Sequence, residues 1–408
     1  MVGLTRRDFL ALSASAGTAL AASQILAGCG GDQDPVPTKA NKHPSRVAAV
    51  RGTDLHEMAR QALEVLGGAG AIVRPGDTVF IKPNFMAVGM FANPFVTGWS
   101  TKPEILIAVT EECLKAGASE VIIGDGAQVP SWSWDGIRTL DGSTSLAAAA
   151  QRLASTYGKR VTLACLEVDT PEWVEIDSSV EIEPGNKKIA VSSLFHYADR
   201  IISVPVLRTH PWTQLTLSMK NVLGVTPLRR YGTLFMRNKL HEAYAQAGGI
   251  EQCFIDILKV RKPDLAILDA SICVEGLMFT VDMKDRVGNW LLLAGTDLAA
   301  VDATAARIVK HDVQEVGQLT MAHAQGLGEI REDLIEVSGA GMDELRTDWI
   351  HAPQVEEWGA ATPAEVNASG DTSPASCKGS RMFNHFATFL LPMATSFFLK
   401  KAIREEPK

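Results

Sequence analysis

The sequence predicts an α/β fold in which mixed or parallel sheets are flanked by helices and arranged in two lobes. Between residues 47 and 345, short runs rich in β-branched and other apolar residues alternate with segments whose apolar residues recur at helical spacing. This alternation is typical of sheets whose strands are joined by covering helices. With 408 residues, 46% hydrophobic and 21% charged, the chain has the size and composition to bury such a core.

Each expected element has a local signal. Strands are predicted where apolar runs are bounded by turn residues, at residues 47–50, 78–82, 120–124, 161–166, 200–206, 264–269, 290–294 and 335–338. Helices are predicted where apolar residues recur every three or four positions, at residues 55–66, 103–115, 145–157 and 249–260, and in a helix that begins at Asp297. Pro103 suits a first helical turn, and Gly117 suits a helix end. A more polar, β-rich insertion spans residues 173–191.

The N-terminus carries the features of an export signal with a lipid attachment site. The run Thr5-Arg-Arg-Asp-Phe-Leu10 is a twin-arginine pattern, and an apolar segment rich in Ala and Ser follows it. That segment ends in Leu26-Ala-Gly-Cys29, which resembles a bacterial lipobox. We therefore expect residues 1–28 to be a signal peptide and Cys29 to be lipidated, which would anchor the protein at the periplasmic, extracytoplasmic face of a membrane. The alternative is a plain N-terminal membrane helix in which Cys29 occurs by chance.

Polar segments flank the predicted domain, and an apolar segment lies near the C-terminus. Residues 29–46 are predicted to be a tether, and residues 346–381, which are rich in Ala, Pro, Ser, Thr and Gly, a linker. Residues 382–399 are an apolar stretch at the short limit for a membrane-spanning helix, and a basic tail follows at residues 400–408. Because Pro392 interrupts the stretch, a surface anchor and a helix docked on the domain stay open as alternatives to a span.

Composition and missing motifs exclude several classes of protein and site. A net charge of −8 argues against nucleic-acid binding, because phosphate-binding surfaces carry a basic excess. No Cys-x-x-Cys occurs, so an iron–sulfur cluster or zinc knuckle held by local cysteines is not expected, and the cysteines of the domain are predicted to be core thiols. Neither a Gly-x-Ser-x-Gly elbow nor a Gly-Lys-Ser/Thr phosphate loop occurs. A metal or another cofactor is left open.

Residues 208–227 hold the densest group of polar and titratable side chains in an apolar background. They follow the buried strand predicted at residues 200–206, and ligands of open α/β sheets bind where strands end. His210 and Lys220 are predicted to be the acid/base groups, since an imidazole or a desolvated lysine can move a proton. For His210 the alternative is a loop histidine that caps backbone groups. The groups of this segment predicted to bind an anionic substrate are Arg208 and Asn221.

Other predicted strands also end in polar side chains. Lys82 and Asn84 follow one strand and are predicted to contact and orient an anion, although a surface lysine and a turn asparagine would have the same spacing. Three carboxylates are predicted to hold a metal ion or a ligand hydroxyl, with a plain Gly-Asp-Gly turn as the alternative for the first: Asp125, Asp269 and Glu275. Asp302 stands in an apolar run, where a carboxylate needs a partner, so we expect it to support the site or to be a buried hydrogen-bond hub.

Several runs resemble a known family. They are Val79-Phe-Ile-Lys-Pro-Asn-Phe85, Lys115-Ala-Gly-Ala-Ser-Glu-Val-Ile-Ile-Gly-Asp125, Leu217-Ser-Met-Lys-Asn-Val-Leu-Gly224, Ala294-Gly-Thr-Asp-Leu-Ala-Ala-Val-Asp302 and Gly326-Leu-Gly328. Over roughly residues 47–340 the chain resembles the family called domain of unknown function 362 (DUF362), most specifically in the Lys-Asn-x-x-Gly block. Such families commonly carry a ferredoxin-like iron–sulfur segment, which this chain lacks. The outline is also loosely similar to nickel-pincer lactate racemases, which use histidines and a lysine around their cofactor.

These observations lead to two functional hypotheses of different classes. In the first, the protein is a membrane-anchored periplasmic enzyme that acts on a small anionic, carboxylate-like substrate, with or without a metal. In the second, it is a non-catalytic accessory lipoprotein that binds a ligand or cofactor for a membrane complex, which the two expected membrane attachments favour. The absence of cysteine clusters argues against a third class, an electron-transfer subunit.

Overall fold

The computed structural model describes residues 44–352, apart from residues 87, 89–93, 233–236, 246 and 277–278. The expected signal peptide, Cys29, the C-terminal apolar segment and most of both polar linkers lie outside the described residues. No helix in the described ranges is long and apolar enough to cross a membrane. The described residues belong to one compact unit, where we had expected two lobes.

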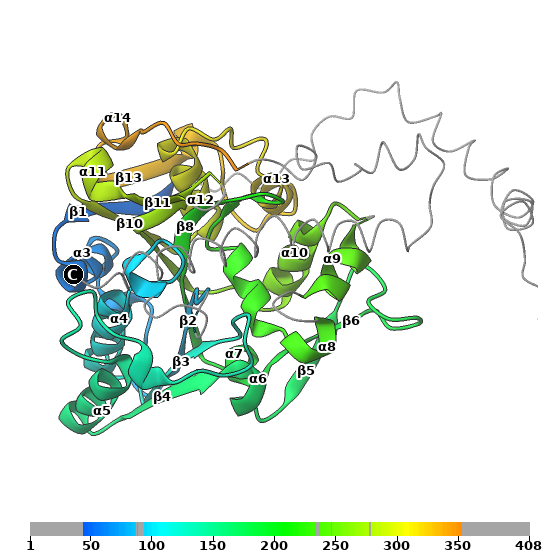
Figure 1. Ribbon diagram of the computed structural model, residues 1–408, viewed down its shortest axis with the longest axis horizontal. Coiled ribbons are helices and arrows are strands. Elements are labelled where there is room, and N and C mark those ends of the chain that lie inside the picture. Colours follow the sequence, from blue (N-terminus) through cyan, green and yellow to red (C-terminus); the bar gives the residue numbers. More distant parts are fainter. Residues whose placement is uncertain are drawn as a thin grey trace, which may run out of the picture. The chain divides into compact units, whose positions relative to one another are not determined.

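A single mixed sheet of eleven strands runs through the described domain (Figure 1). Its main path has the order β13 (Ile335–Gly339), β1 (Ser45–Gly52), β12 (Trp290–Gly295), β10 (Leu265–Glu275), β7 (Arg200–Val204), β2 (Thr78–Pro83), β3 (Glu120–Asp125) and β4 (Arg160–Cys165). Neighbours on this path are parallel, except that β12 is antiparallel to both β1 and β10. Side branches are formed by β11 (Phe279–Asp282) and β8 (Val206–His210), which pair with β10, and by β9 (Gln214–Thr216), which pairs with β8.

Helices cover both faces of this sheet, so the expected α/β class is confirmed. On one face lie α3 (Leu55–Val65), α4 (Pro103–Lys115) and α5 (Leu146–Tyr157), and on the other α10 (Ile250–Val260), α12 (Leu298–Ile308) and α13 (Gly317–Ala324). Shorter α-helices are α6 (Leu166–Asp169), α7 (Ser193–His196), α8 (Leu228–Tyr231), α9 (Asn238–Tyr244), α11 (Met283–Val287) and α14 (Met342–Leu345). The 3-10 helices are η1 (Ala69–Ala71), η2 (Pro94–Val96), η3 (Trp134–Gly136), η4 (Lys220–Val225) and η5 (Glu332–Leu334).

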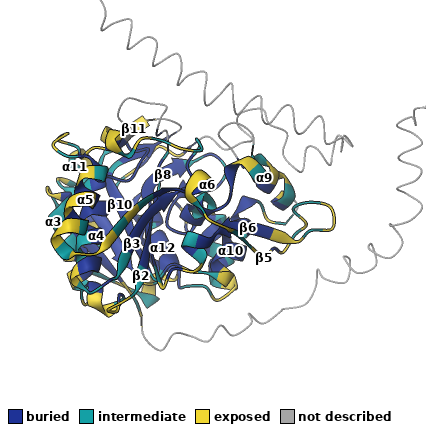
Figure 2. Ribbon diagram, turned by 90° about the horizontal axis from the view of Figure 1, so that it is seen from below, coloured by how far each residue is buried: buried dark blue, intermediate teal, exposed yellow. Residues whose placement is uncertain are grey.

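Strand residues alternate between two hydrophobic clusters, one on each face of the sheet. In β2, Val79 and Ile81 belong to the cluster that contains α3 and α4, and Phe80 belongs to the cluster that contains α10 and α12. Because successive strand side chains point to opposite faces, a strand covered on both faces is apolar at nearly every position. Figure 2 shows the central strands buried. The predicted core thiols are confirmed as buried and free at Cys113, Cys165, Cys253 and Cys273.

Most predicted elements are found close to their predicted ends. The β-rich insertion forms a separate antiparallel pair, β5 (Trp173–Asp177) and β6 (Lys188–Ser192). The side chain of Asp297 accepts the N–H of Ala300 at 3.2 Å and caps α12 as expected. Two predicted strand ends are wrong, however. β10 continues past Asp269 as far as Glu275, and Arg208, which we expected in a loop, lies in β8. Pairing with β8 and β11 continues β10 beyond the end that its sequence predicts, and pairing with β10 places Arg208 in a strand.

Candidate functional site

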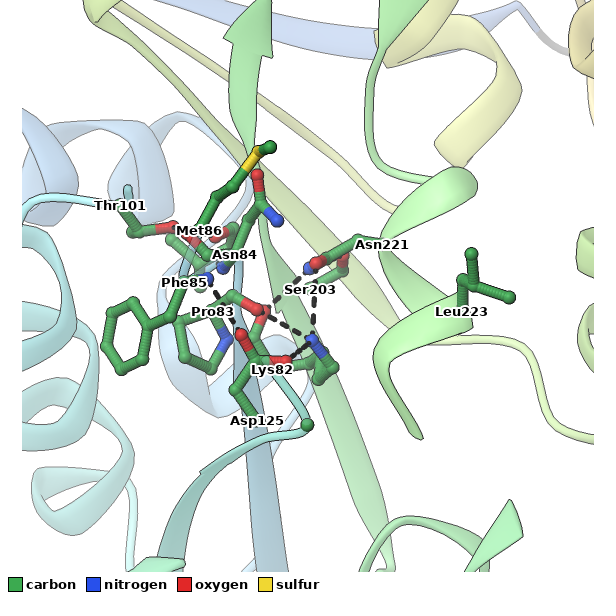
Figure 3. Close-up of polar contacts among 12 residues, drawn as sticks. Lys82, Pro83, Asn84, Phe85, Met86, Thr101, Asp125, Ser203, Asn221 and Leu223 are labelled. Atoms are coloured by element: carbon green, nitrogen blue, oxygen red, sulfur yellow. Dashed lines mark hydrogen bonds and ion pairs between the residues drawn. The ribbon is translucent and has the colours of Figure 1, made fainter. Parts of the chain in front are cut away.

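Three neighbouring parallel strands, β7, β2 and β3, end at the same edge of the sheet. This edge carries Lys82 near the end of β2, Asp125 at the end of β3 and Ser203 near the end of β7. The helix η4 packs against it and brings Asn221. Figure 3 shows the Lys82 side chain in contact with both Asp125 and Asn221. The sequence-based expectation that polar strand ends converge is therefore met for these residues.

Lys82 is 1% exposed, and its amine is surrounded by protein acceptors. It forms an ion pair with Asp125 Oδ1, donates to the Pro83 carbonyl at 2.8 Å and lies 3.4 Å from Asn221 Oδ1. The second oxygen of Asp125 accepts the N–H of Phe85 at 2.7 Å. A buried charge needs such partners, since an unpaired one costs several kcal/mol. Because the Lys82 amine faces three protein acceptors, it has no N–H left for the predicted anion. Both oxygens of Asp125 are likewise bound by protein groups.

Asn221 connects η4 to this edge of the sheet through hydrogen bonds. Its amide nitrogen donates to the Lys82 carbonyl at 2.8 Å and to Ser203 Oγ at 3.0 Å, so it is not available for the predicted anion contact. Gly224 lies on the same side of the helix, because residues three apart eclipse in a 3-10 helix. A Cβ atom at Gly224 would stand 2.7 Å from both Lys82 Nζ and Asp125 Oδ1. The Asn and Gly of the Lys-Asn-x-x-Gly block thus enclose the buried ion pair.

Lys220 faces away from that ion pair. Figure 3 shows Leu223 on the side of η4 opposite Lys82, and Lys220 precedes Leu223 by one 3-10 turn. Its Nζ donates to Thr213 Oγ1 at 2.9 Å. Burial, and after it the nearby guanidinium of Arg208, hold the pKa of Lys220 well below its ordinary value. The charged form of Lys220 is therefore less favoured than in an ordinary lysine, and the residue keeps part of its surface exposed.

Arg208 is a second basic side chain of the candidate site, besides Lys220. Its side chain rises from β8, is 6% exposed, touches the sulfur of Met86 and lies 5.6 Å from the centre of the Trp99 ring. The Nε atom is buried and has no hydrogen-bond partner, and among the described residues no carboxylate forms an ion pair with Arg208. Burial lowers the pKa of Arg208 to about 10. Its charge is thus desolvated without a compensating anion from the described chain.

A buried acid, Glu251, completes this group. It lies at the start of α10, and burial raises its pKa while the nearby Lys220 opposes the shift. Lys220 is thus within electrostatic reach of both a guanidinium and a carboxyl group. We call Arg208, Thr213, Lys220 and Glu251 together the Arg208–Lys220 cluster.

Two further polar groups belong to the surroundings of Arg208. Thr216 is its register partner in the β8–β9 ladder, so the two side chains share a face, and the buried Thr216 hydroxyl has no partner. Asn84 follows β2, and its backbone N–H donates to Thr101 Oγ1 at 2.9 Å. Its amide oxygen is buried without a partner, and Figure 3 shows the amide directed away from the Lys82–Asp125 pair, on the side of Met86.

His210 is half-buried at the end of β8. Its Nδ1 accepts the N–H of Trp212 at 3.2 Å, and the two rings are tilted against each other with centres 5.9 Å apart. This geometry matches the alternative that the sequence left open, a histidine that caps backbone groups in a turn.

The carboxylates predicted to hold a metal ion or a ligand hydroxyl have separate protein partners. Asp269 is fully buried, lies 3.4 Å from the Lys102 amine and accepts the N–H of Lys102 at 3.0 Å and the hydroxyl of Ser271 at 2.6 Å. Glu275 forms an ion pair with Arg286 and accepts the N–H of Ile350 at 3.1 Å. Within the described ranges, no group of three His, Cys, Asp or Glu side chains is arranged to hold a metal ion.

Asp302 lies in α12 beneath the segment that leads into η4. Its two oxygens accept the N–H groups of Ser218 at 2.8 Å and Met219 at 3.0 Å, which fixes the turn just before Lys220. Burial raises the pKa of Asp302 to about 7, against the lowering effect of these hydrogen bonds. Asp302 therefore supports the position of Lys220 from within the core.

Sequence reasoning missed three residues of this region. Thr213 is an ordinary loop residue by its neighbours, and Glu251 lies in the helix predicted at residues 249–260 without having been singled out. Arg237 was given no role; it is buried and donates to the carbonyls of Gly126 and Thr226, each at 2.8 Å. An acid next to the apolar face of α10 was a signal for Glu251; nothing local marks Arg237 or Thr213.

A surface cleft of about 360 Å³ lies elsewhere, among α3, α4 and α5. Its lining includes His56, Glu104, Glu111 and Tyr157 and none of the predicted site residues. Glu111 accepts the Tyr157 hydroxyl at 2.9 Å and lies 3.4 Å from the His56 ring. One oxygen of Glu104 in this lining is buried without a hydrogen-bond partner. Since none of the residues predicted from the sequence lines this cleft, the Arg208–Lys220 cluster is kept as the candidate site.

Comparison with family models now identifies the chain. The model described as "Domain of unknown function (DUF362)" matches residues 79–307, which is more than half of the sequence and includes the Lys82–Asp125 pair, the Arg208–Lys220 cluster and η4. The protein belongs to the DUF362 family. The resemblance inferred from the Lys-Asn-x-x-Gly block is confirmed.

Individual relatives of this DUF362 protein are distant. A thylakoid-associated protein of Synechocystis sp. is 26% identical over 269 residues, which are 66% of this chain and 74% of that protein. Among solved structures, the lactate racemase apoprotein of Thermoanaerobacterium thermosaccharolyticum aligns with a TM-score of 0.36 and 10% identity over 67% of this chain and 59% of its own. A protein from Thermotoga maritima aligns with a TM-score of 0.33 and 12% identity over 55% of this chain and 53% of its own. The DUF362 chain spans less than two thirds of either structure.

Proposed function

We propose that this DUF362 protein is an enzyme that acts on a small carboxylate-bearing substrate at the Arg208–Lys220 cluster. One observation carries the proposal: two neighbouring basic side chains are desolvated, and no carboxylate of the described chain forms an ion pair with Arg208. Burying an uncompensated charge costs several kcal/mol. A bound carboxylate offsets that cost for Arg208, so the site is selective for anions.

Each group has its own part in binding. Arg208 holds the carboxylate, because a guanidinium offers two parallel N–H donors that match the two carboxylate oxygens. Thr216 adds a hydroxyl that lacks a partner within the described residues and can donate to a carboxylate oxygen. The unpaired atom of Asn84 is its amide oxygen, which can only accept a hydrogen bond. Lys220 supplies the reactive group, since a lysine acts as a base or a nucleophile only in its neutral form.

The state of Lys220 favours an enzyme over a binding protein. A site that only binds an anion is strongest with a charged lysine, whereas burial and Arg208 disfavour the charged form of Lys220. A hydrogen bond to Thr213 and the turn held by Asp302 also fix the position of the amine. Strongly shifted pKa values on well-positioned groups are more frequent at catalytic sites than elsewhere.

Replacing Arg208 by methionine is expected to change stability in two opposite ways. Without ligand, the variant should unfold at a higher temperature than the wild type, because the substitution removes a desolvated charge and keeps an apolar side chain of similar length. Malonate or lactate at a concentration about a hundred times its Kd should raise the free energy of unfolding of the wild type by about 2.7 kcal/mol. The same ligand should leave the free energy of unfolding of the variant unchanged. Thermal unfolding of both proteins, with chloride as the control anion, measures these shifts.

Arg160→Met is the matched control, because the Arg160 side chain is 77% exposed on β4. It should respond to carboxylates as the wild type does. A carboxylate response that persists in Arg208→Met, or that is missing in the wild type across a panel of small carboxylates, would contradict the proposed site.

We also propose that the protein is held at a membrane through a lipid on Cys29. The lipobox sequence supports this, and the Synechocystis relative is named as thylakoid-associated. Expressed in a bacterium, the wild type should sediment with membranes, and Cys29→Ala should shift most of the protein to the supernatant. Cys377→Ala, which changes a cysteine outside the lipobox, is the control. If Cys29→Ala stays fully membrane-bound and the wild type incorporates no labelled fatty acid, the anchor is not Cys29.

A further inference from the structure

We propose that Lys220 is a nucleophile that forms an imine with the carbonyl group of a small oxo acid whose carboxylate is held by Arg208. The inference rests on the proposed function and names its substrate class and its covalent step. It follows from a comparison of the buried lysines and from the hydrogen bonds around Lys220.

The buried lysines at this sheet edge fall into two kinds. Lys82 is paired with Asp125, and Lys102 lies 3.4 Å from Asp269, so each has an aspartate that stabilises its positive charge. Among the described residues Lys220 has no carboxylate within ion-pair distance, and its strongest charged neighbour is the guanidinium of Arg208. Lysines that form imines are activated by desolvation and by a neighbouring cation. Lys82 is also buried near a cation, Arg237, but Lys220 alone of the three has such surroundings without an aspartate paired to its amine.

Hydrogen bonding directs the amine of Lys220. The Thr213 hydroxyl donates to the Leu215 carbonyl at 3.1 Å, so its oxygen is left to accept from Lys220 Nζ at 2.9 Å. An N–H of the neutral amine therefore points at Thr213, and the lone pair points away from it. Lys220 as a residue is partly exposed, and the proposal requires that a small substrate reach that lone pair from this exposed side.

The distribution of charge fits an oxo acid better than a simple carboxylate. In the proposed complex Arg208 binds the carboxylate end, and Lys220, which lies within electrostatic reach of Arg208, attacks an atom further along the substrate. A carbonyl carbon at that position is an electrophile that a neutral amine attacks. Glu251, which is buried and feels the charge of Lys220, can keep or release a proton as the nitrogen changes its protonation.

The step balances without an oxidant or a reductant. The lone pair of Lys220 forms a bond to the carbonyl carbon, and the electrons of the C=O π bond move to oxygen, which takes up a proton. The resulting carbinolamine loses its oxygen as water while the nitrogen gives up its second proton, and a C=N bond forms. The two hydrogens of the amine leave in that water.

Reduction traps such an imine as a stable secondary amine. The purified full chain is incubated with pyruvate and sodium cyanoborohydride at neutral pH, and its intact mass and peptides are measured. We expect one adduct per chain on Lys220, formed at least tenfold faster than on any surface lysine, and no adduct when lactate replaces pyruvate. Excess malonate should slow trapping at least tenfold by occupying Arg208.

Variants separate the covalent step from binding. Lys220→Arg should abolish the adduct and keep the carboxylate-dependent thermal shift, while Arg208→Met should lose the shift and trap pyruvate at least tenfold more slowly. Lys188→Arg changes an exposed lysine and should trap like the wild type. Peptide mapping of the wild type needs no variant, so the result holds even if Lys220→Arg folds poorly, and Lys220→Met is then the second choice.

Two negative results have different meanings. If pyruvate and malonate shift the unfolding temperature but no oxo acid of a graded size series labels Lys220, the imine is overturned and the carboxylate site stands. If no carboxylate shifts the wild type and labelling is spread over surface lysines, the proposed function and the imine both fall.

Discussion

Replacing Asp125 by alanine is expected to destabilise the protein by about 3–5 kcal/mol, because it leaves the buried Lys82 without its counter-charge. Asp125 is the only carboxylate paired with Lys82 within the described residues, and both side chains are almost fully buried. In the variant, Lys82 can avoid a buried charge only by giving up its proton. Denaturant unfolding of wild type and variant at neutral pH measures the loss.

The pH dependence of this loss has a definite sign. Burial already lowers the pKa of Lys82, and removal of Asp125 lowers it further. A folded pKa below the unfolded one means that the unfolded chain binds more protons, so the stability of Asp125→Ala should rise with pH up to the ordinary lysine pKa. The deficit against the wild type should shrink accordingly at alkaline pH.

A double variant tests whether the charge or the packing is responsible. Lys82→Met with Asp125→Leu removes both charges and should be much closer to the wild type than Asp125→Ala, because apolar pairs often replace buried ion pairs at little cost. Asp177→Ala, which breaks the exposed pair with Lys188, should have no measurable effect. An Asp125→Ala variant that is as stable as Asp177→Ala would contradict the role assigned to the buried pair.

The stability of the wild type is expected to fall between about pH 4 and pH 7 through Asp302. Its pKa is about 7 in the folded protein, against an ordinary value of 3.8, so in this range the native state keeps a proton that the unfolded state has released. Stability from this group is therefore complete at low pH and is lost as pH rises through the folded pKa. The full change is about 4 kcal/mol, at 1.36 kcal/mol for each pKa unit.

Asp302→Asn should remove this dependence. At pH 5 the variant should be less stable than the wild type, because an amide accepts through one oxygen and the two N–H groups of Ser218 and Met219 need two. By pH 8 the difference should shrink or reverse, since the wild type then buries a charge and the variant does not. Unfolding free energies across this pH range measure the difference.

Thr304→Val is a suitable reference for the Asp302 comparison. It changes a buried side chain two residues further along α12 that donates to the Ala300 carbonyl at 2.7 Å and does not titrate in this range. Its effect should be constant with pH. If the difference in unfolding free energy between wild type and Asp302→Asn is also independent of pH, Asp302 does not titrate between pH 4 and pH 7.

The composition of the candidate site was only partly predictable. Arg208 and Lys220 stood out because polar groups are dense after residue 200, yet their neighbourhood could not be foreseen. Thr213 accepts a hydrogen bond from Lys220, which lies seven positions further along the chain beyond β9, and Glu251 comes from a separate helix. We predicted a strand end at Asp269, with Glu275 shortly after it, because an aspartate after an apolar run normally marks the end of a strand. β10 continues there because β8 and β11 pair with it.

By itself, the sequence determined the α/β class, the order of the elements and the cap of α12 at Asp297. Those features depend on periodicity and on interactions between residues a few positions apart. Only the tertiary structure decided which of these lysines have an aspartate as counter-charge. Lys82 meets Asp125 across 43 positions, because the parallel strands β2 and β3 end side by side. Lys102, at the N-cap of α4, meets Asp269 across 167 positions, where the helix start packs against β10. Lys220 is left with a guanidinium in place of a carboxylate, and this difference in electrostatic partner is set by chain topology, which no local pattern encodes.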